Sequence, residues 1–439
     1  MLRRVVITGL GVVASNGIGK ENFWQACVSG RSGIRKITRF DASQLQSQIA
    51  GEVADFDPLA LGVMEIETFV TDRTTQFALA AANMALKDAG LFNVLSEEER
   101  DTTGVYMGTA IASMEEGEKL WVTLTGSGAH PLRSLSNDFV PPTLYMTHAT
   151  AAAIAMHHQL HGPCIVISTG CSAGADAIGQ AFWAIQEGRA DRMLAGGSDS
   201  ALTNLSMDVF CVLGAMSTRN DDPERASRPY DRQRDGFVMA EGAGVLVLEE
   251  RESALARGAH IYAEIIVFTS NISGHHMTAL PPDGAPLQQL LRQTMAEAEI
   301  SAYDLDYINS HGSSTPFNEA AETAAYKAVF GEQAYHIPIS ATKSMIGHTQ
   351  GAASAIEAIA TALVLDQQII HPTINQVEAD PQCDLDYVPN VARPATVNVA
   401  LTHSSGFGGV NSALLLTRPE WLDQHLARQQ AERPMTTSM

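Results

Sequence analysis

The stretch ISTGCSAGADAIG, at residues 167–179, places the most reactive side chain of the sequence at a structural junction. A β-type run, CIVIS at residues 164–168, leads into it, and a single cysteine, Cys171, comes directly before small residues that open a helix. In α/β sheets, reactive groups lie at the carboxyl ends of strands, and the positive end of a helix dipole favours a thiolate. The pattern therefore predicts a nucleophilic Cys171, against the alternative of a small buried hydrophobe.

Strand-like and helix-like segments alternate on both sides of this stretch. Apolar, β-rich runs predict strands at 3–13, 101–110, 242–250, 261–271 and 305–316, and two strands joined by a glycine-rich hairpin within 396–419. Ala- and Leu-rich runs predict helices at 21–30, 74–90, 147–162, 285–300 and 351–368. This alternation predicts an α/β protein with mostly parallel sheets.

The chain is expected to consist of two similar halves. Each half has a long Ala-rich helix after a loop that carries reactive side chains, although no residue-level repeat is visible. We place the join near 250–260, which gives an N-terminal half at 1–255 and a C-terminal half at 256–418. No flexible linker separates them, so they are expected to pack as one body. A polar C-terminal tail, 419–439, follows and is expected to fray over 429–439.

Composition excludes several classes of protein. The net charge of −21 argues against general binding to nucleic acid or to an anionic membrane. The five cysteines form no CxxC pair and no zinc-like cluster, which predicts no metal site and a reducing cytoplasm. No apolar run reaches the roughly 18 residues of a membrane span. The basic-then-apolar N-terminus resembles a short signal peptide, but Gly9, Gly11 and Gly17 interrupt it, so a first core strand is expected.

Two histidines occupy positions similar to that of Cys171. His311, in NSHGSSTPFNE at 309–319, follows a predicted strand, and His348, in KSMIGHTQGAAS at 343–354, precedes the long helix. A lone histidine is usually structural, but together with Cys171 these positions predict one site. In SSGFGGVN at 404–411, Phe407 is either a core plug in a hairpin turn or a movable lid over a ligand.

These motifs, STGCSAG, HGSSTP, KSMIGHT and SGFGGVN in this order, resemble the β-ketoacyl-[acyl-carrier-protein] synthases, the condensing enzymes with the thiolase fold. The segment RNDDPERASRPYDRQRDGFVMAEGAGVLVLEE, at 219–250, is also typical of them, and the resemblance covers nearly the whole chain. It implies duplicated βαβαβαββ halves in a layered α/β/α/β/α core. The Cys-His-His set resembles that of elongating synthases, whereas chain-initiating relatives use Cys-His-Asn and degradative thiolases use two cysteines.

The resemblance also implies a role for each catalytic residue. Cys171 would attack the acyl thioester and hold the growing chain. His311 and His348 would bind the malonyl thioester carbonyl and promote decarboxylation through their Nε–H groups. Lys343 would order the second histidine, with Glu322 as the acidic partner of that lysine.

Substrate contacts are implied in the same way. The backbone N–H groups of Cys171 and Phe407 would form an oxyanion hole, and Phe407 would gate access of the malonyl group. Thr278, Ser313 and Thr315 match positions that face the phosphopantetheine arm of an acyl carrier protein. Two further residues match positions on the acyl tunnel, namely Ile111 and Phe210. The family needs no metal and no organic cofactor in the enzyme.

Within the family, the chain most resembles the ketosynthase α subunits of type II polyketide synthases. Fatty-acid enzymes usually carry an aromatic residue where Ser405 stands, although HGSSTPFN is closer to the fatty-acid form, so 3-oxoacyl-[acyl-carrier-protein] synthase II remains the alternative. A non-catalytic chain-length-factor subunit would lack Cys171, and an inactive scaffold would have no need of the full set.

The expected partners are an acyl carrier protein and either a chain-length-factor subunit, in a heterodimer, or a second copy of the chain. Arg73 lies in the segment where relatives carry basic residues that dock the carrier protein, and the alternative is a solvated surface arginine.

Overall fold

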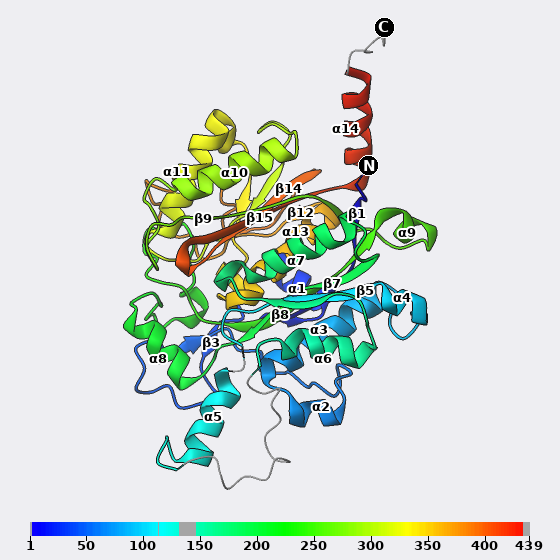
Figure 1. Cartoon of the computed structure of the whole chain (residues 1–439). Helices are drawn as coiled ribbons and strands as arrows, with labels where there is room; N and C mark the ends of the chain where they lie inside the picture. The colour runs from blue at the N-terminus through cyan, green and yellow to red at the C-terminus, as the bar shows by residue number, and fades with distance from the viewer. Residues whose placement is uncertain (1, 113, 131–145, 433–439) are drawn as a thin grey trace.

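Apolar strands from both parts of the chain pair into one eleven-stranded sheet (Figure 1), in a computed structural model that describes residues 2–112, 114–130 and 146–432. The first half contributes β1 (Val5–Ala14), β2 (Gly17–Ile18), β5 (Thr103–Gly108), β6 (Cys164–Ile167), β7 (Arg192–Ser200) and β8 (Glu241–Glu250). The second half contributes β9 (Ala263–Ile272), β10 (Tyr307–Asn309), β11 (Ile339–Ser340), β14 (Val399–Ser405) and β15 (Val410–Thr417).

The two halves repeat one strand order. The first half runs β6-β5-β7-β8-β1 across the sheet and the second runs β11-β10-β14-β15-β9. In the first half β5 pairs in parallel with β6 and β7, and β8 pairs antiparallel with β7 and β1. In the second half β10 pairs in parallel with β11 and β14, and β15 pairs antiparallel with β14 and β9. The predicted duplicated α/β fold is confirmed. The prediction of mostly parallel sheets is wrong, because in each half the last strand returns beside the first.

A short seam joins the halves. β1 and β9 pair antiparallel through Val5 with Ile265, Val6 with Glu264, and Ile7 with Ala263. The connection between the halves runs through α9 (Arg251–Ala256), close to the predicted join. Pairing of the first strands makes the two sheets continuous.

Helices form three layers around the sheet (Figure 1). α3 (Arg73–Asp88) and α6 (Ala149–His158) cover the outer face of the first half, and α10 (Ala285–Glu297) and α11 (Asn318–Phe330) cover that of the second. Between the halves lie α7 (Ala173–Gln186) and α13 (Ala353–Gln367). Further helices lie outside these layers, namely α1 (Lys20–Val28), α2 (Glu65–Val70), α4 (Glu97–Asp101), α5 (Met114–Thr125), α8 (Asn204–Val212) and α12 (Lys343–Ile346).

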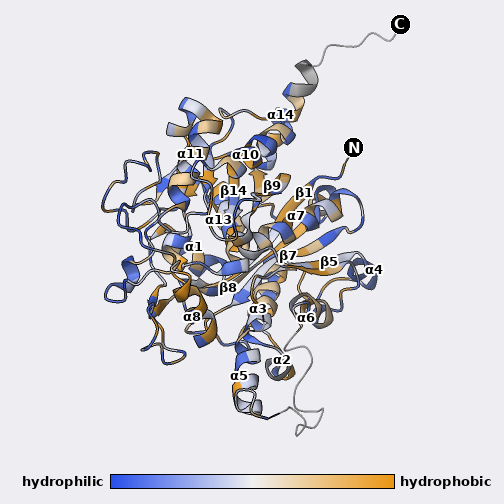
Figure 2. Ribbon diagram, turned by 60° about the vertical axis from the view of Figure 1, so that its left-hand side comes forward, coloured by the Kyte–Doolittle hydropathy of each residue, from blue (hydrophilic) through white to orange (hydrophobic). Residues whose placement is uncertain are grey.

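Small residues in the stretch around Cys171 allow the middle layer to close. A Cβ atom on Gly174 of α7 would lie 2.8 Å from the Cβ atom of Ala355 in α13 and 2.9 Å from the carbonyl oxygen of Gly351. Only glycine permits this approach, since real Cβ atoms do not come within 3 Å of such neighbours. Figure 2 shows the apolar strands and helices gathered in the interior of the molecule. The close contact brings the start of α7 beside the start of α13.

The C-terminal tail is more ordered than predicted. α14 (Pro419–Glu432) projects from the molecule in Figure 1, and its Asp423 forms ion pairs with Arg4 at 2.6 Å and Arg251 at 2.9 Å. The expectation of a polar tail from residue 419 is therefore corrected to a helix through residue 432, and residues 433–439 lie outside the described part of the chain.

Candidate active site

Cys171 lies at the junction that the sequence indicated. It occupies a 3₁₀ turn, Gly170–Ser172, between β6 and α7, and Gly170 takes a left-handed φ of +67° there. Its carbonyl accepts a hydrogen bond from Ser404 Oγ of β14 at 3.1 Å. With only 9% of the residue exposed, the thiol sits in a buried position that both halves help to form.

Burial raises the pKa of the Cys171 thiol to about 11. The Lys343 ammonium and the backbone N–H groups of Phe407 and of Cys171 itself oppose this rise, whereas the Asp199 carboxylate adds to it. The expectation that the helix end would favour a thiolate is wrong for the free protein, because loss of hydration outweighs the favourable groups. The resting nucleophile is therefore a neutral thiol.

Two backbone N–H groups, those of Phe407 and of Cys171 itself, favour the charged form of the Cys171 thiol. The turn that carries Phe407 packs against the turn that carries Cys171. Gly406 allows this approach, because a Cβ atom there would lie 3.1 Å from the Cys171 nitrogen. Paired N–H groups beside a nucleophile are the arrangement of an oxyanion hole.

The Phe407 ring lies at the edge of the site. It is 40% exposed, and it stacks against Phe210 with ring centroids 6.4 Å apart. The interpretation of Phe407 as a core plug is therefore wrong. Its turn, Phe407–Gly409, contains Gly408 at φ +83° and Gly409 at φ +82°, conformations that favour glycine. An exposed ring on such a turn agrees with the interpretation of Phe407 as a movable lid.

His348 holds its ring in one tautomer. The Gln350 N–H donates to His348 Nδ1 at 3.1 Å, so Nδ1 accepts and the hydrogen lies on Nε2. The Val238 carbonyl accepts the His348 N–H at 2.7 Å, and the Phe237 ring packs at 5.3 Å. Burial, and secondly the Lys343 ammonium, lower the pKa of His348 well below its usual range. The ring is a neutral Nε2–H donor.

His311 has the same chemical state. Its Nδ1 lies 3.1 Å from Ser404 Oγ and 3.3 Å from Lys343 Nζ. An ammonium only donates, so Nδ1 accepts and Nε2 carries the hydrogen. Burial, and then Lys343 and His348, lower the pKa of His311 well below its usual range. The two imidazole rings lie 5.4 Å apart, which brings together the two histidines and, through Ser404, Cys171.

The structure corrects both predicted contacts of Lys343. Its Nζ contacts His311 and donates to Glu357 Oε1 at 2.5 Å, so it orders the first histidine rather than the second and its acidic partner is Glu357 rather than Glu322. Burial raises the pKa of Glu357 to about 7 even with Lys343 beside it. The sequence signal for Glu357 is a carboxylate among apolar residues in the first turns of α13, a helix that is buried along most of its length.

Glu322 lies on the other side of the His311 loop. Its Oε1 accepts from the Gly312 N–H at 3.2 Å, and its Oε2 accepts from the Tyr230 hydroxyl at 2.7 Å. Burial raises its pKa. Glu322 is thus a buried support of the loop, and Lys343 affects it only through its charge.

Sequence reasoning missed Asp199, a fully buried residue of β7. Its carboxylate accepts from the Thr109 hydroxyl at 2.6 Å, the Ala110 N–H at 2.7 Å and the Gly351 N–H at 2.6 Å. These contacts tie the loop after β5 to the turn after His348. The signal in the sequence is an acid at the end of a strand of otherwise small and apolar residues, RMLAGGSDS.

The residues expected to face the phosphopantetheine arm lie on two loops. Ser313 and Thr315 hydroxyls are 3.0 Å apart on the loop after His311. Thr278 is exposed, and its neighbour Met277 accepts the Gly408 N–H at 2.7 Å, which places this loop against the Phe407 turn.

The two expected tunnel residues share one apolar cluster. Ile111 and Phe210 are partly buried and pack on a cluster that contains Phe237 and Met239. Phe237 in turn contacts His348, so the cluster adjoins the catalytic side chains.

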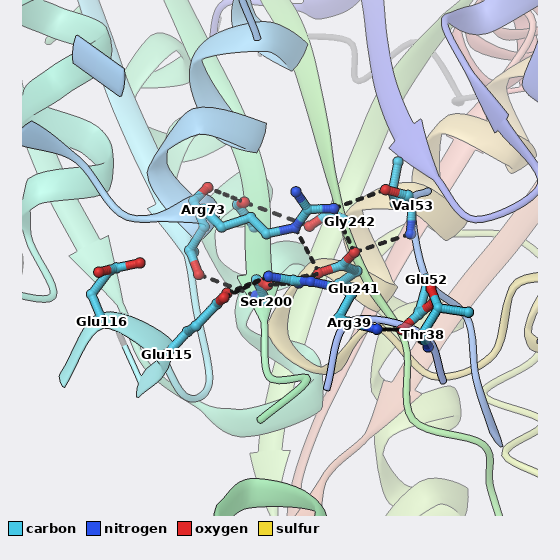
Figure 3. A network of polar contacts seen from close by, with 12 residues as sticks. Thr38, Arg39, Glu52, Val53, Arg73, Glu115, Glu116, Ser200, Glu241 and Gly242 are labelled. Atoms are coloured by element: carbon cyan, nitrogen blue, oxygen red, sulfur yellow. Dashed lines mark hydrogen bonds and ion pairs between the residues drawn. The ribbon is translucent and has the colours of Figure 1, made fainter. Parts of the chain in front are cut away.

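Arg73 belongs to a partly buried ionic network (Figure 3). Its guanidinium donates to Glu241 Oε1 and to the Val53 carbonyl, both at 2.8 Å, and Glu241 is also held by Arg39 at 2.6 Å. Glu241 is fully buried, and the Arg73 side chain is only 20% exposed. The interpretation of Arg73 as a solvated surface arginine is therefore wrong, and its docking role stays a prediction.

Across residues 2–112, 114–130 and 146–432, no three His, Cys, Asp or Glu side chains are grouped as a metal site would require. Within the same ranges, no helix combines the length and apolar character needed to cross a bilayer. The five cysteines are all unpaired.

Both halves of the chain match domains of one known protein family. Residues 2–254 match the β-ketoacyl synthase N-terminal domain and residues 262–377 match the C-terminal domain. A putative polyketide β-ketoacyl synthase 1 of Streptomyces halstedii is 44% identical over 429 residues, 96% of this chain and 99% of that protein. A 3-oxoacyl-[acyl-carrier-protein] synthase 2 of Coxiella burnetii is 42% identical over 417 residues, 95% of this chain and 99% of that protein.

Two solved structures are similar to this chain in both fold and sequence. A type II polyketide synthase acyl-carrier protein in complex with its ketosynthase bound to the hexaketide gives a TM-score of 0.85 at 38% identity, over 95% of this chain and 100% of that one. The ishigamide ketosynthase/chain length factor gives a TM-score of 0.85 at 33% identity, over 95% of this chain and 100% of that one.

Proposed function

Because this chain belongs to the β-ketoacyl synthase family, we propose that it is the ketosynthase of a type II polyketide synthase. It would catalyse the decarboxylative Claisen condensation of malonyl-[acyl-carrier-protein] with an acyl or polyketide chain held on Cys171. The observation that carries this proposal is the convergence of a buried thiol, two neutral Nε2–H histidines and two backbone donors on one site.

The first step loads the chain. The Cys171 sulfur attacks the thioester carbonyl, the bond from that carbonyl to the phosphopantetheine sulfur breaks, and the carrier thiol leaves with the proton that Cys171 gives up. The N–H groups of Cys171 and Phe407 hold the oxyanion that forms in between. A covalent intermediate divides one difficult reaction into two easier ones.

The second step forms the carbon–carbon bond. The bond between the malonyl α-carbon and its carboxylate breaks, carbon dioxide leaves, and the electron pair becomes an enolate. The Nε2–H groups of His311 and His348 hold the enolate oxygen. The enolate carbon then attacks the acyl carbonyl, the bond to Cys171 breaks, and the released thiolate takes a proton from solvent.

Neutral histidines suit this step. A depressed pKa keeps both rings uncharged at neutral pH, so each offers a hydrogen bond without binding the substrate carboxylate as a cation would. Lys343, held by Glu357, keeps the acceptor side of His311 occupied, so that its hydrogen stays on Nε2.

Substrates would arrive on the phosphopantetheine of an acyl carrier protein, and the enzyme itself would use no cofactor. Thr278, Ser313 and Thr315 would contact the arm, and Ile111 and Phe210 would line the acyl chain. We also propose a cytoplasmic location, which suits five unpaired cysteines.

Ser405 favours the polyketide branch. It lines a small pocket together with Asn318 and Asn411, and a larger side chain at this position would reduce that pocket. Identity to a 3-oxoacyl-[acyl-carrier-protein] synthase 2 is 42% and to a putative polyketide β-ketoacyl synthase 1 is 44%, so 3-oxoacyl-[acyl-carrier-protein] synthase II remains the second candidate.

A partner would cover the exposed edge of the sheet. β6 is the edge strand of the sheet and, among the described residues, pairs with β5 alone. It exposes 42% of Ile165, while Met156 on the adjacent α6 is 78% exposed. An unprotected apolar edge strand is a template for pairing with another chain. We propose that a chain-length-factor subunit pairs here, with a second copy of the chain as the alternative.

The test is to express the chain alone, measure its mass in solution, and assay it with radiolabelled acyl- and malonyl-carrier protein, with and without a chain-length factor. We expect acyl label on Cys171 and length-controlled product only with the second subunit. A homodimer that makes one product length at full rate would assign the fatty-acid function instead. Absence of any acyl transfer would refute the condensing activity.

A further inference from the structure

The peptide unit that joins His311 to Gly312 lies between two opposite buried charges. Lys343 Nζ donates to the His311 carbonyl at 2.8 Å, and the Gly312 N–H donates to Glu322 Oε1 at 3.2 Å. Lys343 and Glu322 are each 1% exposed. The negative end of the peptide dipole faces the ammonium and its positive end faces the carboxylate, so both charges fix the plane of this peptide. The direction of the His311 ring depends on that plane.

Tyr230 holds the carboxylate end of this clamp. Its hydroxyl donates to Glu322 Oε2 at 2.7 Å, and its ring stacks on Tyr387 with centroids 3.7 Å apart and planes 11° apart. Tyr230 is 2% exposed and has a φ of +66°. A left-handed conformation costs a bulky residue about 1–3 kcal/mol and persists only where the surroundings enforce it. The strain marks a residue whose placement matters.

A second tyrosine and a histidine extend the network. Tyr326 lies one helical turn after Glu322 in α11, and its hydroxyl is 2.5 Å from His403 Nε2. His403 precedes Ser404, whose hydroxyl lies 3.1 Å from His311 Nδ1. The network therefore begins beside the His311 backbone and ends beside the His311 ring.

We propose that Tyr230, supported by Tyr326 and His403, is a positioning residue for His311 in the decarboxylation step, acting through Glu322 and the Gly312 N–H. This inference rests on the proposed function, since it assigns a task within the same site. None of these side chains needs to touch the substrate. They hold in place the His311 ring, whose Nε2–H contacts the substrate.

Only one of the two half-reactions depends on this network. Acyl transfer needs the Cys171 thiol and the backbone N–H groups of Cys171 and Phe407. The network reaches Cys171 at its carbonyl, through the Ser404 hydroxyl at 3.1 Å, and not at these groups. Decarboxylation needs the Nε2–H of His311 aimed at the enolate oxygen. A general loss of structure would slow both half-reactions, whereas misplacement of His311 would slow only the second.

The test is Tyr230→Phe, which removes one hydroxyl and keeps the ring. We expect carbon dioxide release from malonyl-carrier protein to fall at least tenfold in kcat, with KM and the rate of Cys171 acylation within twofold of wild type. Adding Glu322→Gln should cost little more, because both changes release the same N–H. Tyr326→Phe, one link further away, should lower decarboxylation about threefold in the same selective way.

Tyr307→Phe is the matched control. Tyr307 is also fully buried, and its hydroxyl contacts Ser340 at 2.5 Å, outside the network. We expect this variant to lose thermal stability without a selective effect on decarboxylation. Equal slowing of both half-reactions in Tyr230→Phe, or an unchanged decarboxylation rate in a folded Tyr230→Phe and Tyr326→Phe, would overturn the proposal. If wild type itself neither acylates nor decarboxylates, the proposed function fails instead.

Discussion

The backbone N–H of Gln350 donates to Nδ1 of His348 at 3.1 Å, and this contact fixes which ring nitrogen can act. With Nδ1 occupied as an acceptor, Nε2 must carry the hydrogen while the ring is neutral. The sequence can place a histidine before a helix, but only the fold of the turn after it sets its tautomer.

His348→Ala should therefore block decarboxylation and spare acylation. Loss of one donor to a developing oxyanion lowers turnover by roughly a hundredfold or more. The measurement is carbon dioxide release from malonyl-carrier protein beside acyl transfer to Cys171 in the same preparation. Carbon dioxide release at the wild-type rate would remove His348 from this role.

Cys171→Ala should abolish acylation and leave the protein folded, because a methyl group replaces a thiol of similar size. Acyl label that still appears on the Cys171→Ala protein would show that another residue is the nucleophile.

Alkylation of Cys171 should follow its raised pKa. A thiol with a pKa of about 11 is almost fully protonated at pH 7, so the alkylation rate by iodoacetamide should rise close to tenfold per pH unit from 7 to 10. Peptide mass spectrometry separates Cys171 from the exposed Cys164, which serves as an internal comparison. A rate that is already constant above pH 7 would contradict the buried neutral thiol.

Glu357 should make stability fall as the solution becomes more basic. Its pKa rises from 4.5 to about 7 on folding, so the folded protein binds more protons than the unfolded chain between these values. Its contribution is present below pH 4.5 and is lost as pH rises through 7, by about 1.4 kcal/mol per pKa unit. Denaturant unfolding of wild type and Glu357→Gln at pH 4.5 and 7 should show a smaller fall for the variant. Parallel curves would refute this assignment.

Arg73→Met should weaken the fold rather than carrier-protein docking. The substitution leaves the fully buried Glu241 with Arg39 as its remaining arginine, at a cost of roughly 1–3 kcal/mol. Arg225→Met, at a side chain that is 68% exposed, is the control and should change stability by less than about 0.5 kcal/mol. A carrier-protein affinity that falls in Arg73→Met without loss of thermal stability would instead support the docking role.

The sequence was most informative where a strand ends and a functional residue follows. Cys171, His311 and Phe407 each lie within four residues of the end of a strand, and the fold brings these strand ends to one place. Contacts between buried side chains were harder to predict from the sequence, because they depend on which turn of a helix faces which loop. Glu357 is the example, since its distance from Lys343 along the chain, one helix and one turn, does not show that the two side chains meet.

The effect of burial on pKa could also not be predicted from the sequence. The helix end near Cys171 was correctly located, yet the thiol pKa rises, because loss of hydration on burial outweighs the Lys343 ammonium and the backbone N–H groups of Phe407 and Cys171. The antiparallel return of β8 and β15 beside β1 and β9 was missed for a related reason. Strand direction depends on long connections, and neighbouring apolar runs look alike in either direction.

The seam between β1 and β9 has a consequence for engineering. Cys171, Ile111 and Phe210 precede α9 in the chain, whereas His311, His348 and Phe407 follow it. Under the proposed function, choice of the acyl chain and activation of the malonyl unit are therefore encoded in separate stretches of the gene. Chimeras that exchange everything before α9 between homologous enzymes would thus transplant the preference for one growing chain while retaining the recipient's extender chemistry, provided that the three residue pairs of the seam still match.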